Sequence, residues 1–312
     1  MQLVRRAVID VGTNSVKLLV GEADGFTVIP CLETSLQTRL GRGFYPAHTL
    51  QRAAIADTAG AVATFARTAL EQGAVSTRVI ATSAARDAVN AFALVAAVQK
   101  SAGLDIEIIS GEKEAEWAYR GIASDPRFIG KPLLVLEVGG GSTQVVFADG
   151  ASQPACHSFK LGSVRLLEKL SGADPPPPEE LAACRTHVRD FLNIHMRPVI
   201  DDALKKVPMG AIQLVGSGGT TSVLCSMRLG LAHFDRKAIE SATLLRSELQ
   251  TLMQRLWSQP LAERQKTPGL PPDRADVILT GIAIHEGVMD GFGFTTLRAS
   301  TRGIRFAALL EN

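Results

Sequence analysis

One local pattern occurs twice in this chain and constrains its fold more than any other feature. Residues 7–20 and residues 133–147 each read as an apolar strand, a glycine-bearing turn of hydroxyl and amide side chains, and a second apolar strand. Asp10 in the first copy and Glu137 in the second stand at the same place in the first strand. Two copies of one hairpin, in a chain of 312 residues, predict a duplicated domain.

The region between the two hairpins alternates helical and strand patterns. Apolar residues recur at helical spacing from Leu50 to Ala69, and Gly73 closes that helix. The segments that follow are a strand at 78–81, a helix at about 85–100, a strand at 106–109 and a helix at 112–122. This βαβ alternation predicts an α/β fold with a mixed or parallel sheet between helices.

The second half of the chain has the same character. Residues 125–132 are turn-rich, so we place the domain linker there. Prolines 175–178 predict a stiff surface loop, and residues 179–200 predict a helix. A strand at 211–215 then runs into residues 216–220, a third glycine-hydroxyl loop that opens a helix.

Composition excludes several classes of protein. Hydrophobic residues make up 46% and charged residues 21%, which excludes wholesale disorder and coiled coil. The net charge of +2 means that a polyanion would be held by local clusters, and we expect neither nucleic acid nor a membrane as a partner. No signal peptide or membrane-spanning stretch is recognisable, so we expect a cytoplasmic protein.

Three glycine loops are the candidate binding elements. Backbone N–H groups at such turns point into one small volume, and glycine lets a phosphate oxygen approach where a Cβ would block it. Any one of these loops could instead simply reverse the chain. Occurring after strands in two matching halves, they favour a phosphate ligand.

Acidic and basic side chains near these loops leave alternatives open. Asp10 and Glu137 suit Mg²⁺ if the two halves clasp a cleft, or they bond only to nearby amides. Glu112, Glu114 and Glu116 are typical of the first turns of a helix, where acidic side chains are stabilising. One of these three carboxylates could also take a proton from water, and their spacing does not say which of the three would do so. Arg86 could clamp phosphate or form an ordinary ion pair.

Nucleophile and zinc chemistries fit poorly. The four cysteines form no Cys-x-x-Cys pair, and the six histidines show no metal spacing. Ser142 lacks a Gly-x-Ser-x-Gly elbow, and His285 is better read as a structural residue.

Six segments along the chain form a set of motifs: Asp10-Val-Gly-Thr-Asn-Ser15, Thr82-Ser-Ala-Ala-Arg86, Ile109-Ser-Gly-Glu-Lys-Glu-Ala115, Glu137-Val-Gly-Gly-Gly-Ser-Thr-Gln144, Gly216-Ser-Gly-Gly-Thr220 and Ser300-Thr-Arg-Gly-Ile-Arg305. Together and in this order, they resemble the motifs of the exopolyphosphatase and guanosine pentaphosphate phosphohydrolase (Ppx/GppA phosphatase) family. The resemblance implies two ribonuclease-H-like domains of the actin, Hsp70 and sugar-kinase superfold with an interdomain cleft. The expected domains are 1–125 and 126–299, with a C-terminal helix at 300–312 packing back on the first.

The resemblance also implies a role for each motif residue. Glu114 would be the catalytic base that activates water, and Asp10 and Glu137 would hold Mg²⁺, with Mn²⁺ as an alternative. The implied phosphate-binding residues are Asp10, Gly12, Thr13, Asn14 and Ser15, then Arg86, then Gly139, Gly140, Gly141, Ser142 and Thr143, then Gly218, Gly219 and Thr220.

This chain departs from the family pattern at two acidic positions. Glu137 replaces the usual aspartate, which lengthens the arm by one methylene, and Gln144 replaces the usual glutamate, which removes a charge. A neutral carbonyl in place of a carboxylate should weaken Mg²⁺ binding or shift the preferred metal. The family's Arg-Glu-Gly reads Arg305-Phe-Ala307 here, which should alter how the last helix docks.

The resulting hypothesis is a hydrolase that releases terminal phosphate from polyphosphate, or the 5′ γ-phosphate from guanosine pentaphosphate. Two alternatives are a phosphotransferase of the same superfold and a non-catalytic sensor of polyphosphate or guanosine tetraphosphate. The sequence is compatible with a homodimer and does not fix the oligomeric state. Polyphosphate needs a basic track, for which the candidates are Lys160, Arg165, Arg298, Arg302 and Arg305, each of which could also be a solvated surface charge.

Overall fold

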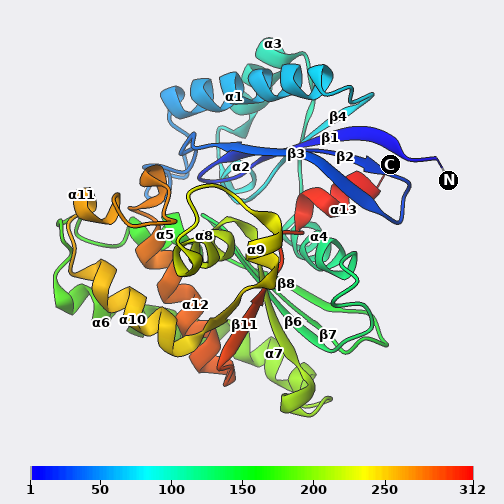
Figure 1. The fold of residues 1–312 in the computed structure, drawn as a ribbon. Coiled ribbons are helices and arrows are strands. Elements are labelled where there is room, and N and C mark those ends of the chain that lie inside the picture. The colour runs from blue at the N-terminus through cyan, green and yellow to red at the C-terminus, as the bar shows by residue number, and fades with distance from the viewer. Residues whose placement is uncertain (1, 312) are drawn as a thin grey trace. The chain divides into compact units, whose positions relative to one another are not determined.

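A computed structural model describes residues 2–311 of the chain. Contacts divide it into two compact units, the first formed by Met1–Pro126 with Arg302–Asn312 and the second by Arg127–Thr301. Each unit contains one sheet with helices packed on it (Figure 1). The described residues include no helix that is long and apolar enough to cross a membrane.

The sheet of the first unit is mixed. Its described strands have the order β3-β2-β1-β4-β5. β1, β2 and β3 pair antiparallel, and β4 and β5 add parallel to β1. The bounds are β1 Val4–Val11, β2 Val16–Ala23, β3 Val28–Leu36, β4 Thr77–Ala81 and β5 Ile106–Ile108.

Two pairs of helices cover the two faces of this sheet. Ile9 and Val79 point to the face covered by α1 and α3, whereas Val8 and Ile80 point to the face covered by α4 and α13. This alternation follows from the two-residue period of a strand, and it makes both faces apolar. The helices are α1 Arg52–Glu71, α2 Ser83–Asp87, α3 Ala91–Ala102, α4 Gly111–Ala123 and α13 Ile304–Leu310.

The sheet of the second unit repeats the first. Its described strands have the order β10-β11-β9-β6-β7-β8, so β6, β7, β8, β9 and β11 take the places of β1, β2, β3, β4 and β5. Their bounds are β6 Leu133–Val138, β7 Thr143–Ala148, β8 Ala155–Phe159, β9 Gln213–Ser217, β10 Thr243–Leu245 and β11 Thr296–Ala299. The predicted α/β class is confirmed, and so is the predicted repetition of one domain fold, that of the actin, Hsp70 and sugar-kinase superfold.

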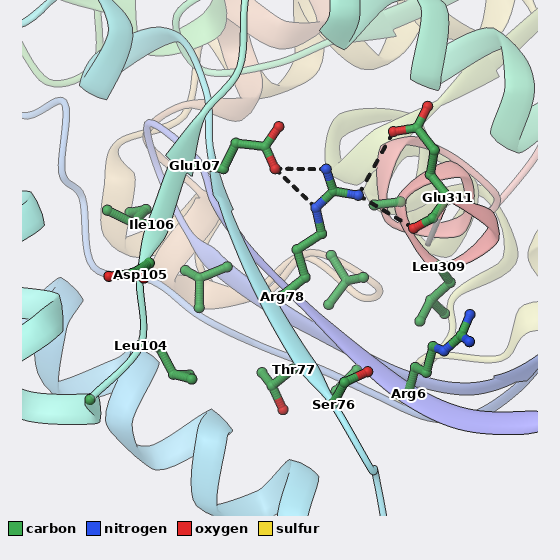
Figure 2. A pocket seen from close by; sticks show the side chains of 15 residues that line it. Arg6, Ser76, Thr77, Arg78, Leu104, Asp105, Ile106, Glu107, Leu309 and Glu311 are labelled. Atoms are coloured by element: carbon green, nitrogen blue, oxygen red, sulfur yellow. Dashed lines mark hydrogen bonds and ion pairs between the residues drawn. The ribbon is translucent and has the colours of Figure 1, made fainter.

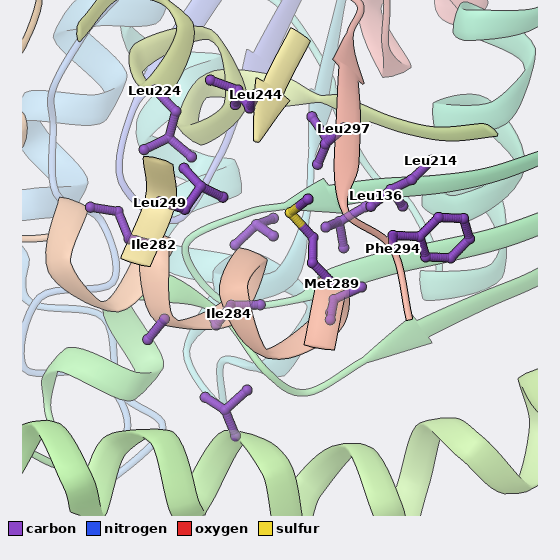
Figure 3. Packing of buried hydrophobic residues seen from close by; sticks show 14 of the residues in the cluster. Leu136, Leu214, Leu224, Leu244, Leu249, Ile282, Ile284, Met289, Phe294 and Leu297 are labelled. Atoms are coloured by element: carbon purple, nitrogen blue, oxygen red, sulfur yellow. The ribbon is translucent and has the colours of Figure 1, made fainter. Parts of the chain in front are cut away.

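A long apolar helix fills the core of the second unit. Figure 3 shows Met289 of α12 (Ile278–Phe292) facing Leu136 and Leu214 of the sheet. The other helices of this unit surround the sheet. They are α5 Ser163–Leu167, α6 Pro178–Phe191, η1 Leu192–Met196, α7 Arg197–Leu204, η2 Met209–Ala211, α8 Gly218–Leu229, α9 Arg236–Ser241, α10 Arg246–Trp257, α11 Leu261–Arg264 and η3 Pro272–Arg274.

The helix predicted at 85–100 is wrong as one element, because the chain breaks it into α2 and α3. The break is held by tertiary hydrogen bonds. Asn90 Oδ1 accepts from the Leu50 N–H at 2.8 Å, and the Val89 N–H donates to the His48 carbonyl at 2.9 Å. These partners lie far away in sequence, so helical periodicity could not reveal them.

Two further elements differ from their predicted form. The helix predicted at 179–200 contains a π-helical turn, η1, just before Pro198, which lies in the first turn of α7 and has no N–H to donate. The third glycine loop is shorter than predicted. Gly216 and Ser217 stay in β9, and α8 begins directly at Gly218.

The last helix, α13, packs on α4 in the first unit. A Cβ at Gly121 would lie 2.2 Å from the Gly303 carbonyl oxygen, so the two segments touch closely there. Arg305 donates to the Leu18 carbonyl at 2.8 Å and to Glu33 at 3.1 Å, and Arg302 donates to the Ser124 carbonyl at 2.9 Å. Arg302 and Arg305 therefore hold the C-terminal segment against the rest of the first unit. Two of the five residues considered for a basic track thus have structural partners.

Buried His285 makes the stability of the second unit sensitive to acid. It is 0% exposed, and its two ring nitrogens lie 2.8 Å from the Gly281 carbonyl and 3.0 Å from the Thr221 hydroxyl. Burial lowers the pKa of His285 to about 4, from 6.5. Between pH 4 and pH 6.5, His285 is therefore mostly protonated in the unfolded chain and mostly neutral in the folded chain.

We therefore expect the free energy of unfolding to fall as the pH falls from 6.5 toward 4, by up to about 3 kcal/mol from this group alone. Urea unfolding between pH 7 and pH 4.5 measures it. His285→Asn, whose side chain does not titrate, should lose less stability over this range than wild type. Equal losses would show that His285 titrates normally.

Candidate functional site

The first of the candidate phosphate loops, Gly12–Ser15, joins β1 to β2 and is called the first phosphate loop below. Gly12 N–H donates to the Ser15 carbonyl at 3.0 Å, which closes a tight turn. Thr13 and Ser15 are each 4% exposed, so both side chains are buried. The loop thus offers hydroxyls and amides from one compact turn, as an oxyanion requires.

Asp10 lies at the base of this loop and is 3% exposed. Its Oδ2 is 3.5 Å from Lys17 Nζ, while its Oδ1 is buried with no hydrogen-bond partner among the residues that the structure describes. A buried carboxylate oxygen without a partner is costly in a folded protein, and such atoms often mark a place for an ion or water.

Arg86 and Glu114 meet at the carboxyl ends of the next two strands. Arg86 follows β4 and Glu114 follows β5, in α4. Arg86 Nη1 donates to Glu114 Oε2 at 3.0 Å and to the Ile109 carbonyl at 3.0 Å. The expected phosphate-loop, arginine and glutamate residues of the first unit therefore come from neighbouring strand ends, where ligands of α/β sheets bind.

The structure distinguishes the three acids at the start of α4. Glu112 is exposed, and bonds to its own backbone N–H and to Ser110 lower its pKa. Glu116 forms ion pairs with Lys113 at 3.8 Å and Arg120 at 3.5 Å. Glu114 is 7% exposed and faces Arg86, so it is the buried acid of the three.

The second phosphate loop joins β6 to β7 in the second unit. Gly139 N–H donates to the Ser142 carbonyl at 2.9 Å, which matches the closing bond of the first loop. The first amides of α5 hold it from outside, because Ser163 N–H donates to the Gly139 carbonyl and Val164 N–H to the Gly140 carbonyl. Arg165 Nε donates to the Gly141 carbonyl at 2.9 Å.

Glu137 and Gln144, the two residues that depart from the family pattern, both form side-chain hydrogen bonds. Glu137 Oε2 accepts from Ser217 Oγ at 2.7 Å. Gln144 is 1% exposed, and its Nε2 donates to Ser142 Oγ at 2.9 Å and to Ser158 Oγ at 3.1 Å. The amide of Gln144 therefore holds a hydroxyl of the phosphate loop in place.

The third loop opens α8 beside an arginine that sequence reasoning missed. Gly218 has φ +80°, and a Cβ there would lie 3.0 Å from Glu137 Cγ. A Cβ at Gly219 would lie 2.5 Å from Nη1 of Arg274, whose pKa is lowered by burial. Thr220 donates to the Val138 carbonyl at 3.0 Å. Arg274 stands in a proline-rich turn with no motif around it, so no local signal identified it.

A hollow in the first unit is separate from these residues. It has a volume of about 810 Å³ and lies at the amino ends of β4 and β5, where Arg78 bonds to Glu107 and approaches Glu311 (Figure 2). None of the predicted site residues lines it. Its ion pairs link the sheet to the end of α13.

Each unit has one carboxylate of the kind that hard divalent cations prefer. In the first unit, Asp10 Oδ1 is buried without a hydrogen-bond partner among the described residues, and in the second unit Glu137 Oε2 accepts from Ser217. Within residues 2–311 no cluster of three or more His, Cys, Asp or Glu could hold a metal by itself. This composition suits Mg²⁺, which is commonly held by one or two carboxylates with waters and substrate phosphates.

Cysteine chemistry is disfavoured by burial. Burial raises the pKa of Cys184 and of Cys225 to about 12, so neither thiol ionises at neutral pH.

Comparisons with known proteins agree with the motifs. A family model described as the Ppx/GppA phosphatase family matches residues 8–311. The Exopolyphosphatase 2 of Mycobacterium tuberculosis is 34% identical over 297 residues, covering 92% of this chain and 90% of that protein.

Solved structures share the fold over the whole length. An exopolyphosphatase-like protein has 26% identity and a TM-score of 0.87, covering 100% of this chain and 98% of that one. The Aquifex aeolicus member of the Ppx/GppA family has 27% identity and a TM-score of 0.77, covering 99% and 97%. With its motifs in the predicted order and the family model matching nearly all of its length, this chain belongs to the Ppx/GppA phosphatase family.

Proposed function

We propose that the protein removes the terminal phosphate of inorganic polyphosphate, a specific form of the phosphohydrolase activity that its family supports. The observation that carries this proposal is Glu114, a buried carboxylate held 3.0 Å from Arg86 at the end of the sheet that also bears Asp10 and the first phosphate loop. The named relative Exopolyphosphatase 2 supports polyphosphate as the substrate class.

In this proposal the chain's own groups divide the work between binding and proton transfer. The amides and hydroxyls of the Gly12–Ser15, Gly139–Thr143 and Gly218–Thr220 segments bind phosphate oxygens. Arg86 binds the terminal phosphoryl group and orients Glu114. Glu114 accepts a proton from the attacking water, and the shortened phosphate chain leaves in line. A divalent cation bound by the Asp10 carboxylate of the first unit, or by the Glu137 carboxylate of the second, would neutralise charge on the phosphates.

Phosphate release tests the proposal directly. The purified protein is incubated with long-chain polyphosphate, guanosine pentaphosphate or ATP, with Mg²⁺ or Mn²⁺ and then with EDTA. We expect metal-dependent release that is fastest from polyphosphate. Preferred release from guanosine pentaphosphate would overturn the substrate class, and binding without release from any substrate would favour a sensor. Transfer from ATP to an added acceptor would favour a kinase.

Gln144 provides a second test of the same site. In Gln144→Glu, the hydroxyls of Ser142 and Ser158 can rotate to donate to the new carboxylate, so the buried charge has two donors. An added anionic oxygen near the metal should lower the Mg²⁺ concentration for half-maximal rate by about tenfold.

The measurement is the rate of phosphate release against Mg²⁺ concentration. Gln254→Glu, which adds the same charge on the exposed side of α10, serves as the control and should change nothing. An unchanged Mg²⁺ dependence in a well-folded Gln144→Glu would place Gln144 outside the metal site.

A further inference from the structure

The first phosphate loop is held by a turn that no catalytic motif includes. This turn, residues 37–41, follows β3. Asn14 Nδ2 donates to Gln37 Oε1 at 3.0 Å, Arg39 N–H donates to the Asn14 carbonyl at 3.0 Å, and Gly41 N–H donates to the Thr13 carbonyl at 2.7 Å. Both the backbone and a side chain of the loop are therefore tied to the same external turn.

Gly41 touches the loop so closely that a side chain at this position would displace Thr13. A Cβ at Gly41 would lie 2.3 Å from Thr13 Cγ2, whereas the Thr13 carbonyl oxygen would be 3.2 Å away. The methyl group of Thr13 is therefore the main obstacle. Since Thr13 is only 4% exposed, it could avoid the new methyl group chiefly by rotating about its Cα–Cβ bond, and that rotation would also move its hydroxyl.

Arg39 adopts a backbone conformation that non-glycine residues rarely take. Its φ is +50°, in the left-handed region. This conformation places the Arg39 N–H against the Asn14 carbonyl. Strained backbone of this kind persists where the surroundings over-determine it, which is common next to functional sites.

The second unit contains a similar close approach of a glycine to its loop, with different hydrogen bonds. There, Lys160-Leu161-Gly162 directly follows β8, whereas two residues lie between the end of β3 and Arg39-Leu40-Gly41. Leu40 is 0% and Leu161 is 2% exposed, so both leucines anchor their turns in a core. A Cβ at Gly162 would lie 2.4 Å from the Gly140 carbonyl oxygen, so this glycine also abuts a phosphate loop.

We infer that the turn at 37–41 is a positioning element of the active site, which fixes the hydroxyl of Thr13 against the transferred phosphoryl group through the close contact of Gly41. This inference rests on the proposed phosphohydrolase function. Gly41 and Gln37 act through Thr13 and Asn14 and need no contact with the substrate. Misplacing a phosphate ligand by a fraction of an ångström should reduce turnover more than it reduces binding.

A double-mutant cycle tests the inference. We expect Gly41→Ala to lower kcat for phosphate release by about 30-fold with less than about a threefold change in KM. In the Thr13→Ser background, which lacks the obstructing methyl group, the same substitution should lower kcat by less than about threefold. Gly60→Ala, at an exposed site of α1 with no atom within 4 Å of the new Cβ, is the matched control and should leave kcat unchanged.

Substitutions of Gln37 test the side-chain hydrogen bond between the turn and the loop. Gln37→Glu keeps an oxygen that accepts from Asn14 Nδ2, so it should retain most of the kcat that Gln37→Leu loses.

Failure of the inference and failure of the proposed function give different results. An active wild type with a Gly41→Ala kcat within twofold of it, or with equal losses in both Thr13 backgrounds, would overturn the positioning role alone. A wild type that releases no phosphate from any substrate would overturn the proposed function. In that case, urea unfolding of the same four proteins still measures the Thr13–Gly41 coupling, and additive effects would overturn the positioning role too.

Discussion

Glu114→Gln is expected to lower kcat for phosphate release by about a thousandfold, because general-base contributions typically lie between 10²-fold and 10⁴-fold. A glutamine carbonyl can still accept the 3.0 Å bond from Arg86, so the fold and the position of Arg86 should persist. The variant loses only the ability to take a proton from water. KM and the binding of polyphosphate should therefore change little.

Two neighbouring acids on the same helix provide matched controls for this variant. Glu112→Gln removes one charge from an exposed position in the first turn of α4, and Glu116→Gln removes one from a surface ion-pair network. Each should keep kcat within about twofold of wild type, because surface ion pairs contribute little. If either control lost as much activity as Glu114→Gln, or if Glu114→Gln kept more than half of its rate, the assignment of the base would be wrong.

Gly162→Ala should have the second-largest effect, a loss of at least about a hundredfold in kcat. The new Cβ would lie 2.4 Å from the Gly140 carbonyl oxygen and 2.5 Å from the Gly140 and Gly141 carbonyl carbons. These are backbone atoms of the second phosphate loop, which cannot rotate away as a side chain can. The loop must move, and the bonds from Ser163 and Val164 to its carbonyls must lengthen.

Two further variants distinguish between two causes of lost activity in Gly162→Ala, displacement of the loop and failure of the protein to fold. Gly210→Ala adds a methyl group where no atom lies within 4 Å, so it should retain wild-type activity and stability. Ser163→Pro, at the first position of α5 where proline is tolerated, removes both the N–H bond and the longer Oγ bond to the Gly139 carbonyl, and should lose about tenfold in kcat. Urea unfolding and circular dichroism verify that each variant is folded. Wild-type kcat in a folded Gly162→Ala would show that the loop tolerates displacement.

Much of the candidate site could be read from the chain alone because its signals are local. Each phosphate loop joins two strands in one short segment, so glycine and hydroxyl residues there identify the turn directly. The order of the motifs also identified the family, and the shared strand order of the two sheets agrees with the duplicated hairpin. The places of Asp10, Arg86 and Glu114 at adjacent strand ends follow from that topology.

Other features depend on partners that lie far away in sequence. The break between α2 and α3 depends on a bond from Leu50 to Asn90, and periodicity carries no information about it. Arg274 reaches Gly219 from a turn more than fifty positions further along the chain. The role of Gln144 could be read only as a lost charge, whereas the fold reveals two hydroxyl partners for its amide.

By itself, the sequence determined the α/β class, the duplication, the family and the positions of the glycine-bearing turns between paired strands, because strand alternation, helical spacing and turn chemistry are encoded within a few residues. Only the tertiary structure decided which of the three acids on α4 is buried against an arginine, and which glycines hold the loops from outside. Those properties are steric and electrostatic relations between segments that meet only when the chain has folded, so no local pattern can express them.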